Sequence, residues 1–164
     1  VEDVCQLLNL PPGRKYQVSF REVVEVVARW ASAPTVETMR LLELYAFSYL
    51  IGNGDLHAKN VSLIWSPVVR LSPAYDLLST LPYPNLERRM ALPLDGRDDN
   101  FRLDHFVSFG ERYRLRPDAV RARITRVCER LEPWIERMAE IGLEVEATEG
   151  LQAEVRRRVR TLQR

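Results

Sequence analysis

The stretch Ile51-Gly-Asn-Gly-Asp-Leu-His-Ala-Lys-Asn-Val-Ser-Leu-Ile64 determines how the rest of this 164-residue chain is arranged. An apolar run that begins at Leu41 stops at Gly52-Asn53-Gly54. Glycine adopts positive φ readily, so these two glycines suit a tight turn at the end of a helix. The turn presents Asp55, and an apolar segment resumes at Val61. The pattern predicts a buried helix, a polar loop and a short strand, in that order.

Three polar residues in and after this loop have an informative spacing. Asn60 follows Asp55 by five positions, and Asp76 comes 16 positions after Asn60, beyond an expected hairpin. In phosphoryl-transfer sites a loop Asp meets the attacking hydroxyl, while an Asn and a second Asp hold Mg²⁺. Mg²⁺ takes few protein ligands and prefers hard oxygens, because phosphates and water fill its other positions. We therefore expect Asp55 to accept a proton, and Asn60 and Asp76 to bind the metal.

Simpler structural roles exist for the same three residues. Asp55 would cap amides of its own turn, as loop aspartates often do. Asn60 would bond the loop backbone, and Asp76 would cap a turn that begins at Leu77. Spacing alone leaves these alternatives open.

Two stretches resemble the C-terminal lobe of HipA-type serine/threonine kinases, the toxin half of a bacterial toxin–antitoxin pair. They are Asn53-Gly-Asp-Leu-His-Ala-Lys-Asn60 and Leu71-Ser-Pro-Ala-Tyr-Asp-Leu-Leu-Ser-Thr-Leu-Pro-Tyr83. The start, Glu2-Asp-Val-Cys-Gln-Leu-Leu8 and then Lys15-Tyr16, is similar to the opening of that lobe. Leu103-Asp-His-Phe106, together with the helices expected after it, fits the end of that lobe, so the resemblance covers nearly the whole chain.

The resemblance implies one domain over residues 1–164, mainly α with a small β-hairpin, like the helical C-terminal lobe of a protein-kinase-like fold. Its implied activity is transfer of the ATP γ-phosphoryl group to a Ser or Thr, with Mg²⁺ as cofactor. It assigns five residues by position: catalytic Asp55, the Mg²⁺ ligands Asn60 and Asp76, and His57 and Lys59 near the ATP phosphates.

One departure concerns the ATP-binding half of such an enzyme. A kinase also needs a loop over the phosphates and a strand lysine. This chain has two lysines: Lys15 follows Pro-Pro-Gly-Arg in a turn, and Lys59 lies inside the catalytic loop. We expect the N-terminal ATP-binding lobe to be absent from this chain and the isolated chain to be nearly inactive. The resemblance further implies a DNA-binding antitoxin partner and a protein substrate, possibly an aminoacyl-tRNA synthetase.

Two other functions fit parts of the sequence. A non-catalytic interaction module would keep the lobe fold without a phosphate loop. A small-molecule kinase of the aminoglycoside or choline kinase type would also contain a loop similar to Gly54-Asp-Leu-His57. In that group the metal Asp usually lies in an Ile-Asp-aromatic context, whereas this chain has Pro73-Ala-Tyr-Asp76.

Composition limits the remaining possibilities. The net charge of +1 gives no case for direct nucleic-acid binding. No run approaches the ~18 apolar residues of a membrane span, and the first residues show no signal-peptide pattern. Cys5 and Cys128 lie far apart in apolar helical patterns, as buried thiols of a reducing compartment do. We therefore expect a cytoplasmic protein without a membrane interaction.

Periodicity and caps predict the other elements. Ser19 and Glu22 form a capping-box pattern, and a second helix cap is expected at Thr35 or Thr38. The arginines of residues 156–160 are expected on a solvated helix face. The expected helices are 2–9, 20–30, 35–51, 103–113, 117–142 and 147–163, and the expected strands are 61–65, 69–71 and 88–94.

Overall fold

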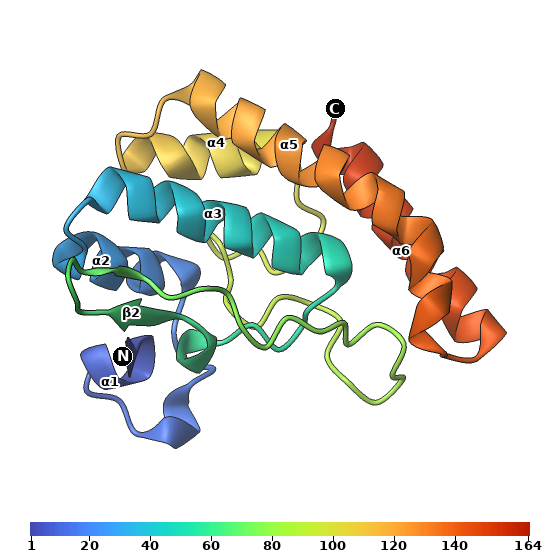
Figure 1. Ribbon diagram of the computed structural model, residues 1–164, viewed down its shortest axis with the longest axis horizontal. Helices are drawn as coiled ribbons and strands as arrows, with labels where there is room; N and C mark the ends of the chain where they lie inside the picture. Colours follow the sequence, from blue (N-terminus) through green and yellow to red (C-terminus); the bar gives the residue numbers. More distant parts are fainter.

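The computed structural model describes residues 1–164, and a long helix, α3 (Pro34–Ile51), runs through its middle (Figure 1). Helix α2 (Phe20–Trp30) lies on one side of α3, and α4 (Leu103–Arg112) and α5 (Pro117–Ile135) lie on the other. Helix α3 buries residues around most of its circumference, which confirms its predicted central position. Its buried side chains include Leu41, Leu42, Tyr45, Ala46, Tyr49 and Leu50.

A small antiparallel sheet of order β1-β2-β3 lies at the N-terminal end of the molecule. Strands β2 (Ser62–Ile64) and β3 (Arg70–Leu71) form the predicted hairpin, with Leu63 opposite Leu71. Strand β1 (Glu2–Asp3) pairs with β2 and was not predicted. The first helix, α1, is therefore shorter than expected and spans Val4–Leu7, with Asp3 as its N-cap.

The strand predicted at residues 88–94 is wrong. Met90, Leu92 and Leu94 are buried in alternation, but the segment makes no strand and only an isolated bridge between Leu94 and Arg97. Its backbone instead bonds to helices: the Leu92 carbonyl accepts from Tyr45 Oη at 2.7 Å, and Pro93 O accepts from Phe20 N at 3.1 Å. An alternating apolar pattern can thus arise in a loop that lies along a core.

The predicted N-terminal cap is confirmed for α2 and is wrong for α3. Ser19 and Glu22 form the predicted capping box of α2. Helix α3 begins at Pro34, after Ala33, so neither predicted threonine caps it. Proline suits the first helical turn because the amide hydrogen that it lacks would have no helical partner there.

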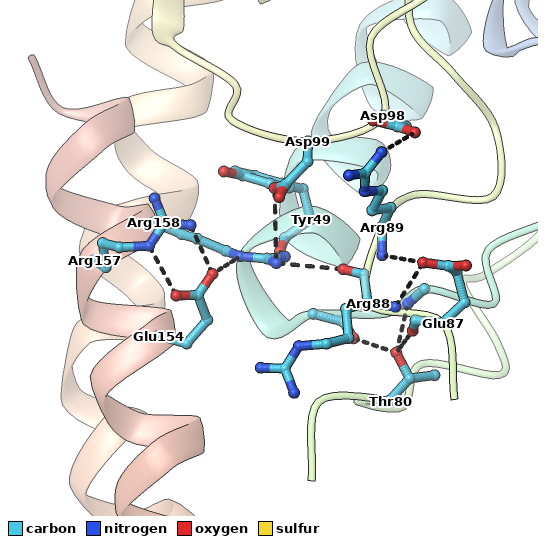
Figure 2. Close-up of polar contacts among 12 residues, drawn as sticks. Tyr49, Thr80, Glu87, Arg88, Arg89, Asp98, Asp99, Glu154, Arg157 and Arg158 are labelled. Atoms are coloured by element: carbon cyan, nitrogen blue, oxygen red, sulfur yellow. Dashed lines mark hydrogen bonds and ion pairs between the residues drawn. The ribbon is translucent and has the colours of Figure 1, made fainter. Parts of the chain in front are cut away.

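The C-terminal part consists of α5, a 3₁₀ segment η3 (Glu136–Ile141) and α6 (Val145–Leu162). Helix α6 packs beside α5 and reaches the end of α3 (Figure 1). The predicted solvated arginine face is wrong for Arg158, which is only 2% exposed. Its guanidinium lies 4.5 Å from the Tyr49 ring centroid and bonds to Glu154 at 2.7 Å (Figure 2).

The two cysteines lie in the core as free thiols, which confirms the prediction that they are buried. Burial raises the pKa of the Cys128 thiol to about 11, so this thiol stays protonated and weakly nucleophilic at neutral pH. None of the helices combines the length and apolar character needed to cross a membrane.

Candidate active site

The loop that carries Asp55 starts where α3 ends. Gly52 has a φ of 73° and caps the helix, with its N–H directed at the carbonyl groups of Ser48 and Tyr49. Asn53 and Gly54 are buried, and Asp55 is partly exposed at the surface. A rigid central helix therefore places Asp55 within one turn of its own C-terminus.

Thr80 stabilises this turn through hydrogen bonds of its side chain and its backbone. Its Oγ1 accepts from Gly54 N at 3.1 Å and lies 2.5 Å from the Glu87 carbonyl oxygen. Thr80 N also donates to Gly52 O at 2.9 Å. The backbone of the loop around Glu87 therefore lies directly against Gly54.

This packing makes a prediction for Gly54→Ala. The new Cβ would lie 2.2 Å from the Glu87 carbonyl oxygen and 2.8 Å from Thr80 Oγ1, so the backbone must shift. We expect a loss of about 1–3 kcal/mol in the free energy of unfolding, as in other overpacked sites. Urea denaturation followed by circular dichroism measures it. Gly150→Ala is the control, because a Cβ there meets nothing within 4 Å; equal losses in both variants would contradict the packing argument.

Asn53 links the two halves of the site. Its Oδ1 accepts from Asp55 N at 3.1 Å, and its Nδ2 donates to the backbone oxygen of Asp76 at 3.3 Å. Asn53 is 1% exposed. Sequence reasoning overlooked this residue because an Asn between two glycines is also the common composition of a plain turn.

The structure brings Asn60 and Asp76 into direct contact. Asn60 ends a short 3₁₀ segment, η2 (Ala58–Asn60), and Asp76 lies in the irregular segment after β3. Asn60 Nδ2 donates to Asp76 Oδ2. Asp76 has a φ of 55°, a left-handed conformation that Asp tolerates better than most residues. The hairpin thus folds the chain so that these two side chains meet, as their spacing suggested.

The side chains of Asn60 and Asp76 suit a magnesium ion. Asn60 Oδ1 is buried and has no hydrogen-bond partner. A buried acceptor without a partner is costly unless something else binds it. The Asp76 carboxylate adjoins it and is exposed toward solvent. An amide oxygen and a carboxylate are hard ligands of the kind that Mg²⁺ takes, leaving its other positions for phosphate and water.

Tyr75 fixes the segment that carries Asp76. Its hydroxyl donates to the backbone oxygen of Lys59 at 2.5 Å and accepts from Ser62 Oγ at 2.7 Å. Burial raises the pKa of Tyr75, so the hydroxyl remains a donor over the physiological range. Tyr75 therefore connects the segment that carries Asp76 to both η2 and β2.

His57 and Lys59 differ in their surroundings. His57 is 6% exposed, and its Nε2 lies 2.7 Å from Lys15 Nζ. Burial, and then the positive charge of Lys15, lower the pKa of His57, so its ring is neutral at pH 7. Lys59 is partly exposed, and its ammonium group makes no hydrogen bond within the chain. Of the two, Lys59 has the charge and the access that a phosphate contact requires.

Comparison with protein families identifies the chain. A family model described as the HipA-like C-terminal domain matches residues 1–135. The chain belongs to this family. This result confirms the family that the two sequence stretches indicated.

The HipA-like domain has curated relatives that carry kinase names. It is 31% identical over 146 residues to Y4mE of Sinorhizobium fredii, whose kinase name is provisional; the match covers 85% of the domain and 35% of Y4mE. It is 28% identical over 115 residues to the serine/threonine-protein kinase toxin HipA of Shewanella oneidensis, covering 60% of the domain and 26% of that protein. The chain thus spans about a third of the length of these relatives or less.

A solved structure shares the fold of the HipA-like domain. It is the toxin–antitoxin complex of HipA, HipB and operator DNA from Shewanella oneidensis, in which one chain matches with a TM-score of 0.79. The match covers 98% of the domain and 43% of that chain, at 22% identity. The similarity therefore extends into α6, beyond the residues matched by the family model.

Proposed function

We propose that this HipA-like domain is the catalytic lobe of a serine/threonine protein kinase that transfers the γ-phosphoryl group of ATP. The observation that carries the proposal is the contact between Asn60 and Asp76. It leaves a buried amide oxygen without a partner beside a carboxylate. Asn53 bonds both to Asp55 and to Asp76, so the proposed base and the proposed metal site are built as one unit.

Each residue has a specific role in the proposed reaction. Asp55 orients the acceptor hydroxyl and accepts its proton as the new oxygen–phosphorus bond forms and the bond to the ADP oxygen breaks. Asn60 and Asp76 hold the Mg²⁺ that offsets phosphate charge when it is bound. Lys59 contacts the phosphates, whereas the buried His57 stabilises the conformation of the loop. Positioning and electrostatics supply most of the rate enhancement in such sites.

The proposed enzyme requires a second lobe that supplies the phosphate loop and the strand lysine. The side chains that follow Asp76 support such a neighbour. Leu77, Leu78 and Leu86 are 39%, 40% and 49% exposed, which is unusual for leucines grouped in one segment. By analogy with the HipA complex, we propose a DNA-binding antitoxin as partner and a bacterial protein as substrate. We also propose that the fold of the domain is related to the helical lobe of other protein kinases.

Calorimetric titration of Mg·ATP tests the proposed function. The protein is expressed from its complete reading frame, beside an Asn60→Ala/Asp76→Ala variant. We expect Mg²⁺-dependent binding that weakens at least about tenfold in the variant, because both proposed metal ligands are lost. Equal binding by both proteins, or no binding by either, would refute the metal-site assignment.

A matched variant controls for the change in composition. Asn85→Ala/Asp104→Ala alters the same residue types at exposed positions that make no hydrogen bond to Asp55, Asn60 or Asp76. It should bind Mg·ATP like the unmodified protein. Circular dichroism of all three proteins shows whether the buried Asn60 position affects folding instead of binding.

A further inference from the structure

A turn near the N-terminus lies against the proposed catalytic loop. Lys15 and Tyr16 follow the 3₁₀ segment η1 (Pro12–Arg14). The backbone oxygen of Lys15 accepts from Ala58 N at 3.3 Å, which joins the two segments. Both side chains of the turn then contact loop residues about 40 positions later in the sequence.

Tyr16 is bonded directly to the proposed base. Its hydroxyl donates to Asp55 Oδ1 at 2.6 Å. This is the only hydrogen bond of the Asp55 side chain within the chain, so Oδ2 has no partner. A carboxylate can accept on both oxygens, and a bond to one of them fixes its rotation. The other oxygen is left to accept the hydroxyl of a substrate.

Tyr16 is 50% exposed, so burial alone does not fix the position of its ring. The His57 ring meets it edge-on, at a centroid distance of 5.2 Å and an interplanar angle of 73°. The Lys15 ammonium lies 4.8 Å from the centre of the Tyr16 ring, within the range of a cation–π contact. The same ammonium donates to His57 Nε2 at 2.7 Å. Lys15 and His57 therefore support the tyrosine on two sides.

We infer that Tyr16 is a positioning residue that holds the Asp55 carboxylate in the orientation needed for phosphoryl transfer, with Lys15 and His57 supporting it. The inference rests on the proposed role of Asp55 as base. The inference is incompatible with an inhibitory role for Tyr16, in which its hydroxyl would occupy the place of the substrate hydroxyl and slow the reaction.

Tyr16→Phe, in the protein expressed from its complete reading frame, tests the inference. The readout is ADP formed from Mg·ATP as the γ-phosphoryl group passes to water, which requires no knowledge of the natural substrate. We expect kcat to fall about tenfold, since a small loss of orientation lowers the rate without removing the base. The KM for Mg·ATP should not change, because Tyr16 does not contact Asn60 or Asp76. Tyr83→Phe is the control: Tyr83 is 51% exposed and its hydroxyl has no hydrogen bond within the chain.

A second variant separates positioning from a general effect on folding. Lys15→Met should lower kcat by a smaller factor in the same direction. The double variant should be no slower than Tyr16→Phe alone, because Lys15 acts through the tyrosine. Additive losses, or a Tyr16→Phe enzyme as fast as or faster than the unmodified one, would overturn the inference.

The outcome also distinguishes this inference from the proposed function. If the unmodified protein forms ADP, Asp55→Asn does not, and Tyr16→Phe matches the unmodified protein, only the positioning role fails. If Asp55→Asn and the unmodified protein form ADP equally, the proposed function fails and the inference fails with it.

Discussion

Asp55→Asn should lower the rate of phosphoryl transfer by about 10²–10⁴-fold, the usual contribution of a general base. The substitution keeps the size of the side chain and its ability to accept from Tyr16, but it removes the group that takes the proton. Mg·ATP binding should persist, because the proposed ligands Asn60 and Asp76 are unchanged. Initial rates of ADP formation at saturating Mg·ATP, together with a calorimetric titration, measure both effects.

Asp104→Asn is the matched control for this experiment. Asp104 is exposed on α4 and pairs with Arg121, away from the loop. Its loss should leave the rate unchanged, because surface ion pairs contribute little. An Asp55→Asn variant that retained more than a tenth of the activity would show that the proton of the acceptor goes to another group.

Arg158→Met should reduce the free energy of unfolding by about 3 kcal/mol, at the low end for loss of one partner from a buried ion pair. Arg158 Nη1 donates to the Tyr49 carbonyl at 2.5 Å and Nη2 to the Arg88 carbonyl at 3.4 Å (Figure 2). The Arg88 carbonyl would lose this donor, and the Tyr49 carbonyl would keep only the bond from Gly52 N at 3.0 Å. Glu154 would keep its bonds to Arg157, which together with Arg158 lowers the pKa of Glu154 to about 2, so the loss stays moderate.

Differential scanning calorimetry measures the effect of Arg158→Met. For a chain of this size, about 3 kcal/mol corresponds to a fall of about 6–12 °C in Tm. Arg160→Met is the control, because Arg160 is exposed on the same helix and has no ion pair or hydrogen bond within the chain through its guanidinium. Equal falls in Tm for both variants would show that the buried contacts of Arg158 contribute nothing.

The elements that were predicted correctly are those whose sequence signals come from neighbouring residues. The apolar run of α3, the glycines after it and the hairpin each depend on neighbouring residues, and the structure has all three. Strand β1 and the burial of Arg158 depend on partners far along the chain, and both were missed. The wrong strand at residues 88–94 has the same origin, because its alternating pattern reflects contact with helices and not with another strand.

The same difference between local spacing and contacts with distant residues applies to the candidate site. The spacing of Asn60 and Asp76 suggested that a hairpin would bring them together, and the two side chains are in contact. Tyr16 precedes Asp55 by 39 positions and has no spacing rule that connects it to the loop. The similarity of Lys15-Tyr16 to the opening of the family lobe indicated that this turn belongs to the domain. It did not indicate which loop the turn contacts.

The contacts of Arg158 show that α6 contributes to the core of this domain. The family model stops at residue 135, yet a buried charge from α6 bonds to the last turn of α3, immediately before the proposed catalytic loop. A segment outside the family match therefore helps to build the interior on which the candidate loop rests. The residues that identify the family are thus fewer than those that pack the core: a chain shortened to residue 135 would leave the Tyr49 ring and the Arg88 carbonyl without their contacts to Arg158.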